Sequence, residues 1–253
     1  MISFFQKPYR EGTVVNGRYA VEAQLGEGSY GVTYVARDEK TNELVVVKQM
    51  KRTKKKKRIA SFEREACMLR KLNHPQIPKL YDMFDVRGIP HLVMEYIEGD
   101  TIETLIFEKK QTFDEKEAFF LLADVLAIVQ HIHAHEIVHR DLRIPNLIFR
   151  DGVVYVIDFG LARFFHEQDG PFLTLEQQLR RQVDVRSDIY ALGHFLLFLL
   201  YSSHEPTEEE EKSWEDELAL TEEARHVLRR MLQLDEPYAS VAQLARDVAY
   251  VIG

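Results

Sequence analysis

Two neighbouring segments hold the polar side chains whose types and spacing could do chemistry. The first is 139–146, His-Arg-Asp-Leu-Arg-Ile-Pro-Asn, and the second is 158–160, Asp-Phe-Gly. Between them Asp151-Gly152 separates two apolar runs, which is a strong signal for a β-hairpin. Such a hairpin folds the chain back, so the aspartates of both segments and Asn146 can converge on one point. Oxygen-bearing side chains of this kind suit Mg²⁺, which carries phosphates, and therefore indicate phosphoryl-transfer chemistry.

A glycine pattern, Gly26-x-Gly28-x-x-Gly31, lies between two predicted strands at 18–25 and 32–37. The first strand is predicted from its alternation of apolar and polar residues. A dinucleotide-binding fingerprint would require a helix after the glycines rather than a strand. From the residues alone two interpretations stay open. One is a plain hairpin turn, and the other is a loop whose backbone N–H groups approach phosphate oxygens because no Cβ is in the way.

Lys48 lies in a third predicted strand, 44–50, where alternation places it on the same face as Val46 and Met50. A lysine that faces inward is costly unless it meets anions, whereas a lysine at a strand end can reach water. Glu65 favours the first interpretation, because it shares one face of the next predicted helix with apolar residues and needs a cationic partner. We therefore predict a Lys48–Glu65 ion pair that holds the lysine extended toward phosphates.

In this order, and over nearly the whole chain, the motifs resemble those of the eukaryotic-like (Hanks-type) protein kinases. Residues 16–31 are similar to the small bacterial members of that family. The resemblance implies a bilobal α+β fold and the use of ATP with Mg²⁺ or Mn²⁺. It also implies transfer of the γ-phosphoryl group to serine or threonine hydroxyls of a protein substrate that the sequence does not identify, with the chain itself as a further expected acceptor.

The resemblance assigns a catalytic set. Asp141 would accept or steer the proton of the attacking hydroxyl. Arg143, where a lysine is common in serine/threonine members, would hold a phosphate or the catalytic aspartate. Lys48 would bind the α- and β-phosphates, and Glu65 would fix its position. Asp188, in a long predicted core helix, would anchor the loop that carries Asp141.

Metal and nucleotide ligands follow from the same resemblance. Asn146 and Asp158 would hold the magnesium ion. Met94 would be the gatekeeper, and residues 95–97 would form the hinge that hydrogen-bonds adenine. The residues implied to surround ATP are Leu25, Gly26, Glu27, Gly28, Ser29, Tyr30, Gly31, Val32, Thr33, Val46, Lys48, Met94, Glu95, Ile97 and Ile148.

Strand-like and helix-like patterns occupy different parts of the chain, which predicts an α+β fold. Further strands are predicted at 79–86 and 90–96, and helices at 101–109, 114–135, 188–202, 221–234 and 239–251. The expected organisation is an N-terminal extension (1–17), an N-lobe (18–97) and a C-lobe (98–253). The N-lobe would carry the glycine loop, the strand lysine and the helix of Glu65, and the C-lobe would carry the Asp141 motif and a helical core.

Length and composition exclude several classes of protein. With 253 residues, 45% of them hydrophobic and 29% charged, the chain can bury a substantial core. A net charge of −8 argues against a nucleic-acid binder, and the longest apolar run, 191–201, is too short to span a bilayer. The single cysteine, Cys67, fits a reducing, cytoplasmic setting and is expected to be a small buried residue. No pattern bears on the oligomeric state.

The chain departs from the family pattern after residues 158–160. No Ala-Pro-Glu precedes Ser187-Asp188, and a polar, helix-like segment at 175–182 stands in its place. Tyr238 occupies the position of the arginine that normally pairs with that glutamate. Both partners of a buried ion pair are therefore missing together, which is consistent with a remodelled substrate-docking region.

Two other functions stay open on these observations. The altered docking region would suit a small-molecule kinase on the same fold, although the glycine loop and the His-Arg-Asp motif oppose it. A nucleotide-binding pseudokinase scaffold is the third interpretation, but such proteins usually lose an equivalent of Lys48, Asp141 or Asp158, and all are present. Thr174 is either a plain loop threonine or a phosphorylation site that would pair with Arg140.

Overall fold

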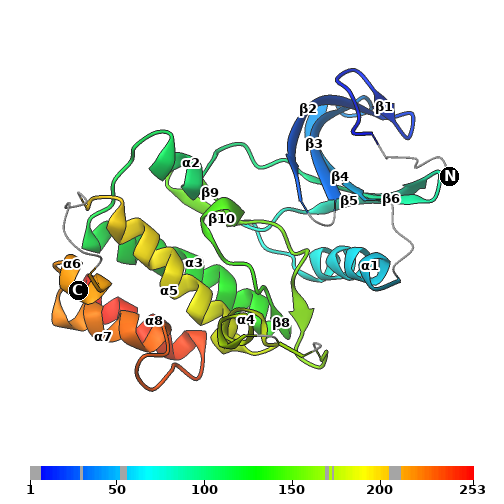
Figure 1. Ribbon diagram of the computed structural model, residues 1–253. Helices are drawn as coiled ribbons and strands as arrows, with labels where there is room; N and C mark the ends of the chain where they lie inside the picture. Colours follow the sequence, from blue (N-terminus) through cyan, green and yellow to red (C-terminus); the bar gives the residue numbers. More distant parts are fainter. Residues whose placement is uncertain (1–6, 29–30, 52–55, 169–170, 173, 205–211) are drawn as a thin grey trace. The chain divides into compact units, whose positions relative to one another are not determined.

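The computed structural model describes residues 7–28, 31–51, 56–168, 171–172, 174–204 and 212–253. The chain forms two compact units, Met1–Glu98 and Gly99–Gly253. The first unit holds a six-stranded sheet with helix α1 (Lys56–Lys71), and the second is mainly helical (Figure 1). The predictions on Ser29 and Tyr30 lie outside the described residues.

The sheet of the first unit has the order β1-β2-β3-β4-β6-β5, and its neighbouring strands are antiparallel. The strands are β1 (Val14–Val15), β2 (Tyr19–Glu27), β3 (Gly31–Asp38), β4 (Glu43–Met50), β5 (Leu80–Val86) and β6 (Ile89–Glu95). Val45 and Val47 of β4 join a buried cluster with Tyr19 on one face, while Met50 packs with residues of α1 on the other. Because alternate residues share a face, Lys48 lies on the α1 side with Met50, as predicted.

Helix α1 packs against β5 and β6, and its residues Phe62 and Ala66 are buried with Leu92 of the sheet. Cys67 follows Ala66 but is exposed, so the prediction of a buried cysteine was wrong. Each helical residue is rotated by about 100° from the one before it, which turns Cys67 away from the apolar stripe that Ala66 belongs to.

In the second unit α3 packs against both α5 and α8, and α7 packs against α5 and α8 in turn (Figure 1). The helices of this unit are α2 (Ile102–Phe107), α3 (Glu115–Ala134), α4 (Leu175–Arg181), α5 (Val185–Tyr201), α6 (Trp214–Glu217), α7 (Glu222–Met231) and α8 (Val241–Ile252). Each predicted helix is present, with its ends displaced by a few residues at most. Among the described helices, α3 is long and apolar enough to cross a membrane, but half of its apolar stretch is buried inside the unit. Its composition is therefore that of a core helix.

The predicted hairpin around Asp151-Gly152 is confirmed. Strand β9 (Leu147–Arg150) pairs with β10 (Val153–Val156), and both turn residues have positive φ, 52° for Asp151 and 81° for Gly152. Positive φ at both central positions is the turn geometry whose twist matches that of the two strands. β7 (Asp100–Thr101) adds to β9, and a second small sheet pairs β8 (Ile137–Val138) with β11 (Arg163–Phe164). The two polar segments of the sequence thus flank one hairpin.

Tyr238 is fully buried between α7 and α8. Its hydroxyl donates to Oδ2 of Asp247 at 2.9 Å, and the guanidinium of Arg230 lies 3.8 Å from the centre of its ring. Arg230 also pairs with Asp247 at 2.9 Å. The hydroxyl and the ring of this tyrosine thus contact one charged side chain from each of the two C-terminal helices, a pair that the sequence patterns did not predict.

The first unit contains an ion pair that should make its stability depend on pH. Arg18 donates from Nε and Nη2 to the two oxygens of Asp38, at 2.7 and 2.6 Å, and lowers the pKa of that carboxyl to about 2. A carboxyl whose pKa is depressed on folding stabilises the protein at pH values above its unfolded pKa. We expect this contribution to be lost as the pH falls from about 4 to about 2.

Chemical denaturation of the wild type and of Arg18→Gln between pH 7 and pH 2 measures the contribution of the Arg18–Asp38 pair to stability. The variant should lose less stability on acidification than the wild type. Arg37→Gln is the control, because the side chain of Arg37 bonds Glu22 and the carbonyl of Asn42 instead of the Asp38 carboxylate. Equal acid sensitivity of wild type and Arg18→Gln would contradict the assignment.

Candidate active site

The loop 139–146, called the Asp141 loop below, is fixed by a carboxylate of α5. Asp188 is fully buried and accepts hydrogen bonds from the backbone N–H groups of His139, at 2.8 Å, and Arg140, at 2.6 Å. Nε2 of His133, on α3, lies 2.8 Å from Oδ2 of the same carboxylate. Burial alone would raise the pKa of Asp188, but the hydrogen bond and charge of His133 outweigh it and lower that pKa. Asp188 therefore stays ionised in the core, and its predicted anchoring role is confirmed.

The Asp141 loop has a strained backbone at its second residue. Arg140 has a φ of 66°, in the left-handed region that residues with a Cβ seldom adopt. His139 is fully buried, and burial lowers the pKa of its imidazole, so the ring is neutral. Its Nδ1 accepts from the backbone N–H of Asp141 at 3.3 Å, which leaves the ring proton on Nε2, 3.2 Å from the carbonyl of Ile157. The loop is therefore tied to the strand end that precedes Asp158.

Asp141 is buried, and both of its carboxylate oxygens are oriented. Asn146 donates from its amide to Oδ2 at 2.8 Å and to the Asp141 carbonyl at 2.9 Å. Arg143 lies with Nε 3.2 Å from Oδ1, so it holds the aspartate, which is one of the two roles predicted for it. Arg181 of α4 approaches the same oxygen at 3.5 Å and donates to the carbonyl of Arg140 at 2.7 Å.

Asp158 follows β10 and is exposed, with a φ of 62° that aspartate tolerates better than most residues. The next residue, Phe159, is buried with its ring against His139, at 4.7 Å between ring centres. The backbone N–H of Ile157 donates to the carbonyl of Asn146 at 3.0 Å. The hairpin thus brings Ile157, the residue before Asp158, to Asn146, which in turn contacts Asp141 within the loop. The convergence of the Asp158 side chain on the same point stays a prediction.

Lys48 and Glu65 form the ion pair predicted from the sequence, inside the first unit. Nζ of Lys48 lies 2.6 Å from Oε1 of Glu65, and both side chains are almost entirely buried. Strand pairing places Lys48 beside Thr33 of β3 and Leu92 of β6. A buried ammonium and carboxylate of this kind need each other, because removing one would leave the other as an unpaired charge.

The three glycines of the glycine loop differ in the space around their Cα atoms. A Cβ built on Gly26 or Gly28 would meet no atom within 4 Å, whereas one on Gly31 would lie 2.6 Å from the carbonyl oxygen of Gln49. Glu27 pairs with Lys51 at 2.6 Å and ties the loop to the end of β4. The first two glycines leave their backbone accessible, and the third is required by the close approach of β3 to β4.

The other residues implied to surround a nucleotide lie in both units. In the first, Val46 and Met94 are directly paired across β4 and β6 and both are half-buried. Ile97 is buried, and Val32 is buried beside the half-buried Thr33. Leu25 is 52% exposed, and Glu95 receives a hydrogen bond from the backbone of Lys79. Ile148 is a buried residue of β9 in the second unit.

Two contributors to the site were not found from the sequence. No residue pattern around His133 predicts its contact with Asp188, which depends on how α3 packs against α5. Arg181 was noted only as part of a polar segment, although it reaches Asp141. Thr174 caps the first turn of α4 by accepting from the backbone N–H of Gln177 at 3.1 Å, and its phosphorylation stays a prediction.

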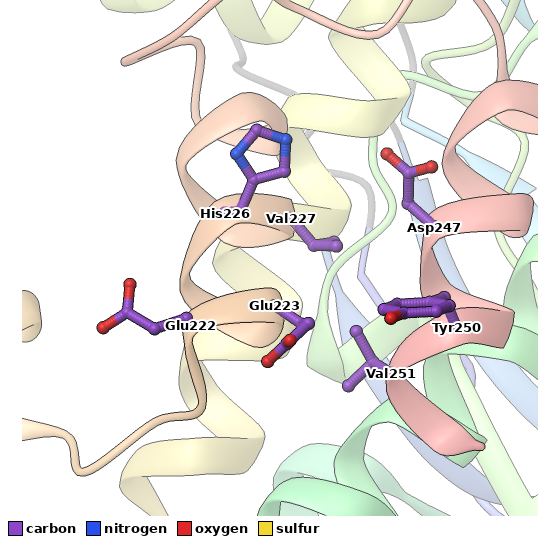
Figure 2. Close-up of a pocket in the computed structure, with 7 residues that line it drawn as sticks. All are labelled: Glu222, Glu223, His226, Val227, Asp247, Tyr250 and Val251. Carbon is purple, nitrogen blue, oxygen red and sulfur yellow. The ribbon is translucent and has the colours of Figure 1, made fainter.

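Two hollows of the second unit differ in their charge. A groove of about 600 Å³, called the arginine groove below, lies between the Asp141 loop, α2, α4 and α5 and includes Asp141 in its lining. A hollow of about 410 Å³ lies between α7 and α8, and Figure 2 shows Asp247, Tyr250 and Val251 of α8 opposite His226 and Val227 of α7. Asp247 in this hollow already bonds Arg230 and Tyr238, so we interpret the hollow as a gap in the packing of α7 against α8 and not as a binding site.

The comparison with known families agrees with this geometry. A family model described as a protein kinase domain matches residues 19–249. The chain belongs to the protein kinase family. The predicted bilobal α+β fold is thereby confirmed.

The kinase has relatives in bacteria. It is 37% identical over 246 residues to "Probable serine/threonine-protein kinase YbdM" of Bacillus subtilis, a match that covers 96% of this chain and 93% of the relative. It is 32% identical over 254 residues to "Serine/threonine-protein kinase B" of Synechocystis sp., covering 87% of this chain and 44% of the relative. "Serine/threonine-protein kinase C" of the same organism is 33% identical over 213 residues, with 74% and 39% covered. The kinase thus spans nearly all of the first relative and less than half of the other two.

Asp188→Asn should damage both the stability and the activity of the kinase. The substitution removes a buried negative charge that His133 and two backbone N–H groups need, so we expect a loss of roughly 3 kcal/mol in the free energy of unfolding. Denaturant titration measures the loss. Asp184→Asn is the control, because Asp184 is a partly exposed helix cap paired with Arg186 and asparagine caps equally well. A loss no larger than that of the control would contradict the anchoring role.

Gly31→Ala and Gly28→Ala should impair different properties, the first the stability of the kinase and the second its binding of nucleotide. The Gly31 variant forces β3 and β4 apart, so we expect it to lower the free energy of unfolding by about 1–3 kcal/mol. The Gly28 variant meets open space, so its stability should change little while its affinity for nucleotide falls, if the loop binds phosphates. Thermal unfolding and titration with ATP separate the two effects. Equal stability of the two variants would show that the approach of β3 to β4 is not what requires Gly31.

Proposed function

We propose that this kinase transfers the γ-phosphoryl group of ATP to serine or threonine hydroxyls of proteins. The observation that carries the proposal is Asp141. Its carboxylate is oriented by Asn146 and Arg143, in a loop whose backbone is bound to the buried Asp188. A general base works only if its carboxylate is held within hydrogen-bonding reach of the attacking hydroxyl, and this loop supplies such a rigid support.

In the proposed reaction the acceptor hydroxyl donates its proton toward the carboxylate of Asp141 as its oxygen bonds to the γ-phosphorus. The bond between the γ-phosphorus and the bridging oxygen breaks, and ADP leaves with the electron pair. Arg143 and Arg181 lie 3.2 and 3.5 Å from one carboxylate oxygen of Asp141 and help to hold that carboxylate in place. The neutral His139 has a positioning role, because its ring atoms bond the backbone on both sides.

ATP and a divalent cation belong to the proposal. Asn146 and Asp158 offer amide and carboxylate oxygens, the donors that Mg²⁺ or Mn²⁺ accepts when phosphates and waters complete its coordination. Both amide N–H contacts of Asn146 go to Asp141, so its amide oxygen remains for the cation. When bound, the cation would neutralise charge on the β- and γ-phosphates. Lys48, held by Glu65, would bind the α- and β-phosphates beneath the open backbone of Gly26 and Gly28.

We also propose a reducing compartment such as the cytoplasm. The support is Cys67, a free and exposed thiol and the single cysteine of the sequence. Exposed thiols without a disulfide partner suit compartments in which thiols are kept reduced.

Asp141→Asn should abolish most phosphoryl transfer without abolishing nucleotide binding. Removal of a general base typically lowers the rate about 10²- to 10⁴-fold, and the amide keeps the shape of the carboxylate. Transfer of labelled γ-phosphate from Mg-ATP to the protein itself and to generic protein acceptors measures the rate. Asp216→Asn, an exposed residue of α6, is the matched control. A wild type that binds ATP but transfers no phosphate to any acceptor would contradict the proposed function and favour a scaffold or a small-molecule kinase.

A further inference from the structure

The arginine groove is basic although the whole chain has a net charge of −8. The charged side chains that line it are Arg140, Arg143, Arg180 and Arg181 on the positive side, and Asp141 and Glu103 on the negative side. Three of the arginines are accessible, with side chains exposed by 61% for Arg143, 38% for Arg180 and 33% for Arg181. A positive groove on a negative protein concentrates anionic groups at that place.

Of the arginines in this groove, Arg180 is the best placed to bind a carboxylate of another molecule. It lies on α4 next to Arg181, and its Nε donates to Oε1 of Glu176 at 3.0 Å, one helical turn away. The side chain of Glu176 is 66% exposed. Surface pairs at this spacing are worth only a few tenths of a kcal/mol, so a second carboxylate can replace or join Glu176.

The groove also fits a polypeptide better than a free anion. Phe107 of α2 and Phe198 of α5 line its far wall, 52% and 44% exposed, with their rings edge to face at 6.4 Å between centres. Exposed aromatic side chains beside charged groups are typical of surfaces that bind protein segments. An acceptor segment in this groove would place its hydroxyl at Asp141 and its neighbouring side chains beside the arginines.

We propose that this kinase selects acceptor segments with an aspartate or glutamate close to the phosphorylated hydroxyl, and that Arg180 binds that acidic side chain. The inference rests on the proposed function and names its substrate class. Arg143 and Arg181 are held near Asp141 and add to the positive field, so a lysine or arginine of the acceptor is repelled at the same place. Helix α4, which stands where the sequence departs from the family pattern, therefore supplies the selectivity.

A peptide set tests the selectivity directly. Each peptide contains one serine in a neutral background, with a single aspartate or a single lysine at each of the three positions on either side. Phosphorylation of each peptide by the kinase gives a ratio of kcat/KM for the acidic and the basic peptide at every position. At one or more positions we expect this ratio to exceed about tenfold, mainly through KM.

Two variants of α4 should move that ratio in opposite directions. Arg180→Glu reverses the charge at the proposed contact and should lower the ratio about tenfold. Glu176→Gln removes the competing carboxylate and should raise the ratio about twofold. Arg246→Glu makes the same charge change on the exposed side of α8 and should leave the ratio unchanged. Thermal unfolding of each variant verifies that the fold is intact.

The outcomes are distinguishable. Peptide phosphorylation without any preference for acidic residues overturns the inference and leaves the proposed function standing. A preference that Arg180→Glu and Arg246→Glu reduce equally also overturns it, because a general charge effect would then explain the selectivity. Absence of transfer to any peptide, to generic proteins and to the kinase itself overturns the proposed function, and the inference with it.

Discussion

One buried carboxylate determines the geometry of the active site. Asp188 has no exposed surface, yet it is ionised, because two backbone N–H groups and His133 surround it. A charge in a protein interior is tolerated only when hydrogen-bonding partners are held beside it. The hydrogen bonds to Asp188 in turn fix the positions of the backbone at His139 and Arg140 and of the His133 ring. The left-handed backbone of Arg140 has a free-energy cost that these bonds offset. The packing of α5 against α3 therefore sets the position of Asp141.

The region that normally docks substrate is built differently in this kinase. The buried arginine and glutamate pair of the family is absent from the sequence, and Tyr238 is bound instead to Asp247 and Arg230 within the C-terminal helices. The segment before α5 forms the short helix α4, and Arg181 of that helix contacts both Asp141 and the carbonyl of Arg140. The helix that stands where the sequence departs from the family pattern thus contacts the carboxylate of Asp141.

Much of the fold and part of the site could be predicted, because turn residues and the alternation of apolar and polar residues are strong sequence signals at the hairpin and in the strand of Lys48. Asp151-Gly152 allows few alternatives to a tight hairpin, and strand alternation was enough to put Lys48 on the face of α1. The contact of Arg181 with Asp141 joins residues far apart in the sequence and depends on tertiary packing, which no periodicity reports. His133 was missed for the same reason. The prediction for Cys67 was wrong because cysteine as a residue type favours burial, whereas this position lies next to the apolar stripe of α1 and not on it.

The exposure of Cys67 has a practical consequence. The chain contains a single thiol, and it lies two residues from Glu65 on the same helix, on the side that faces solvent. A fluorophore or spin label attached there would have one attachment point without any competing cysteine. The label would move with α1, the helix whose Glu65 pairs with Lys48. Together with a second, engineered probe elsewhere in the kinase, it would report displacements of that helix.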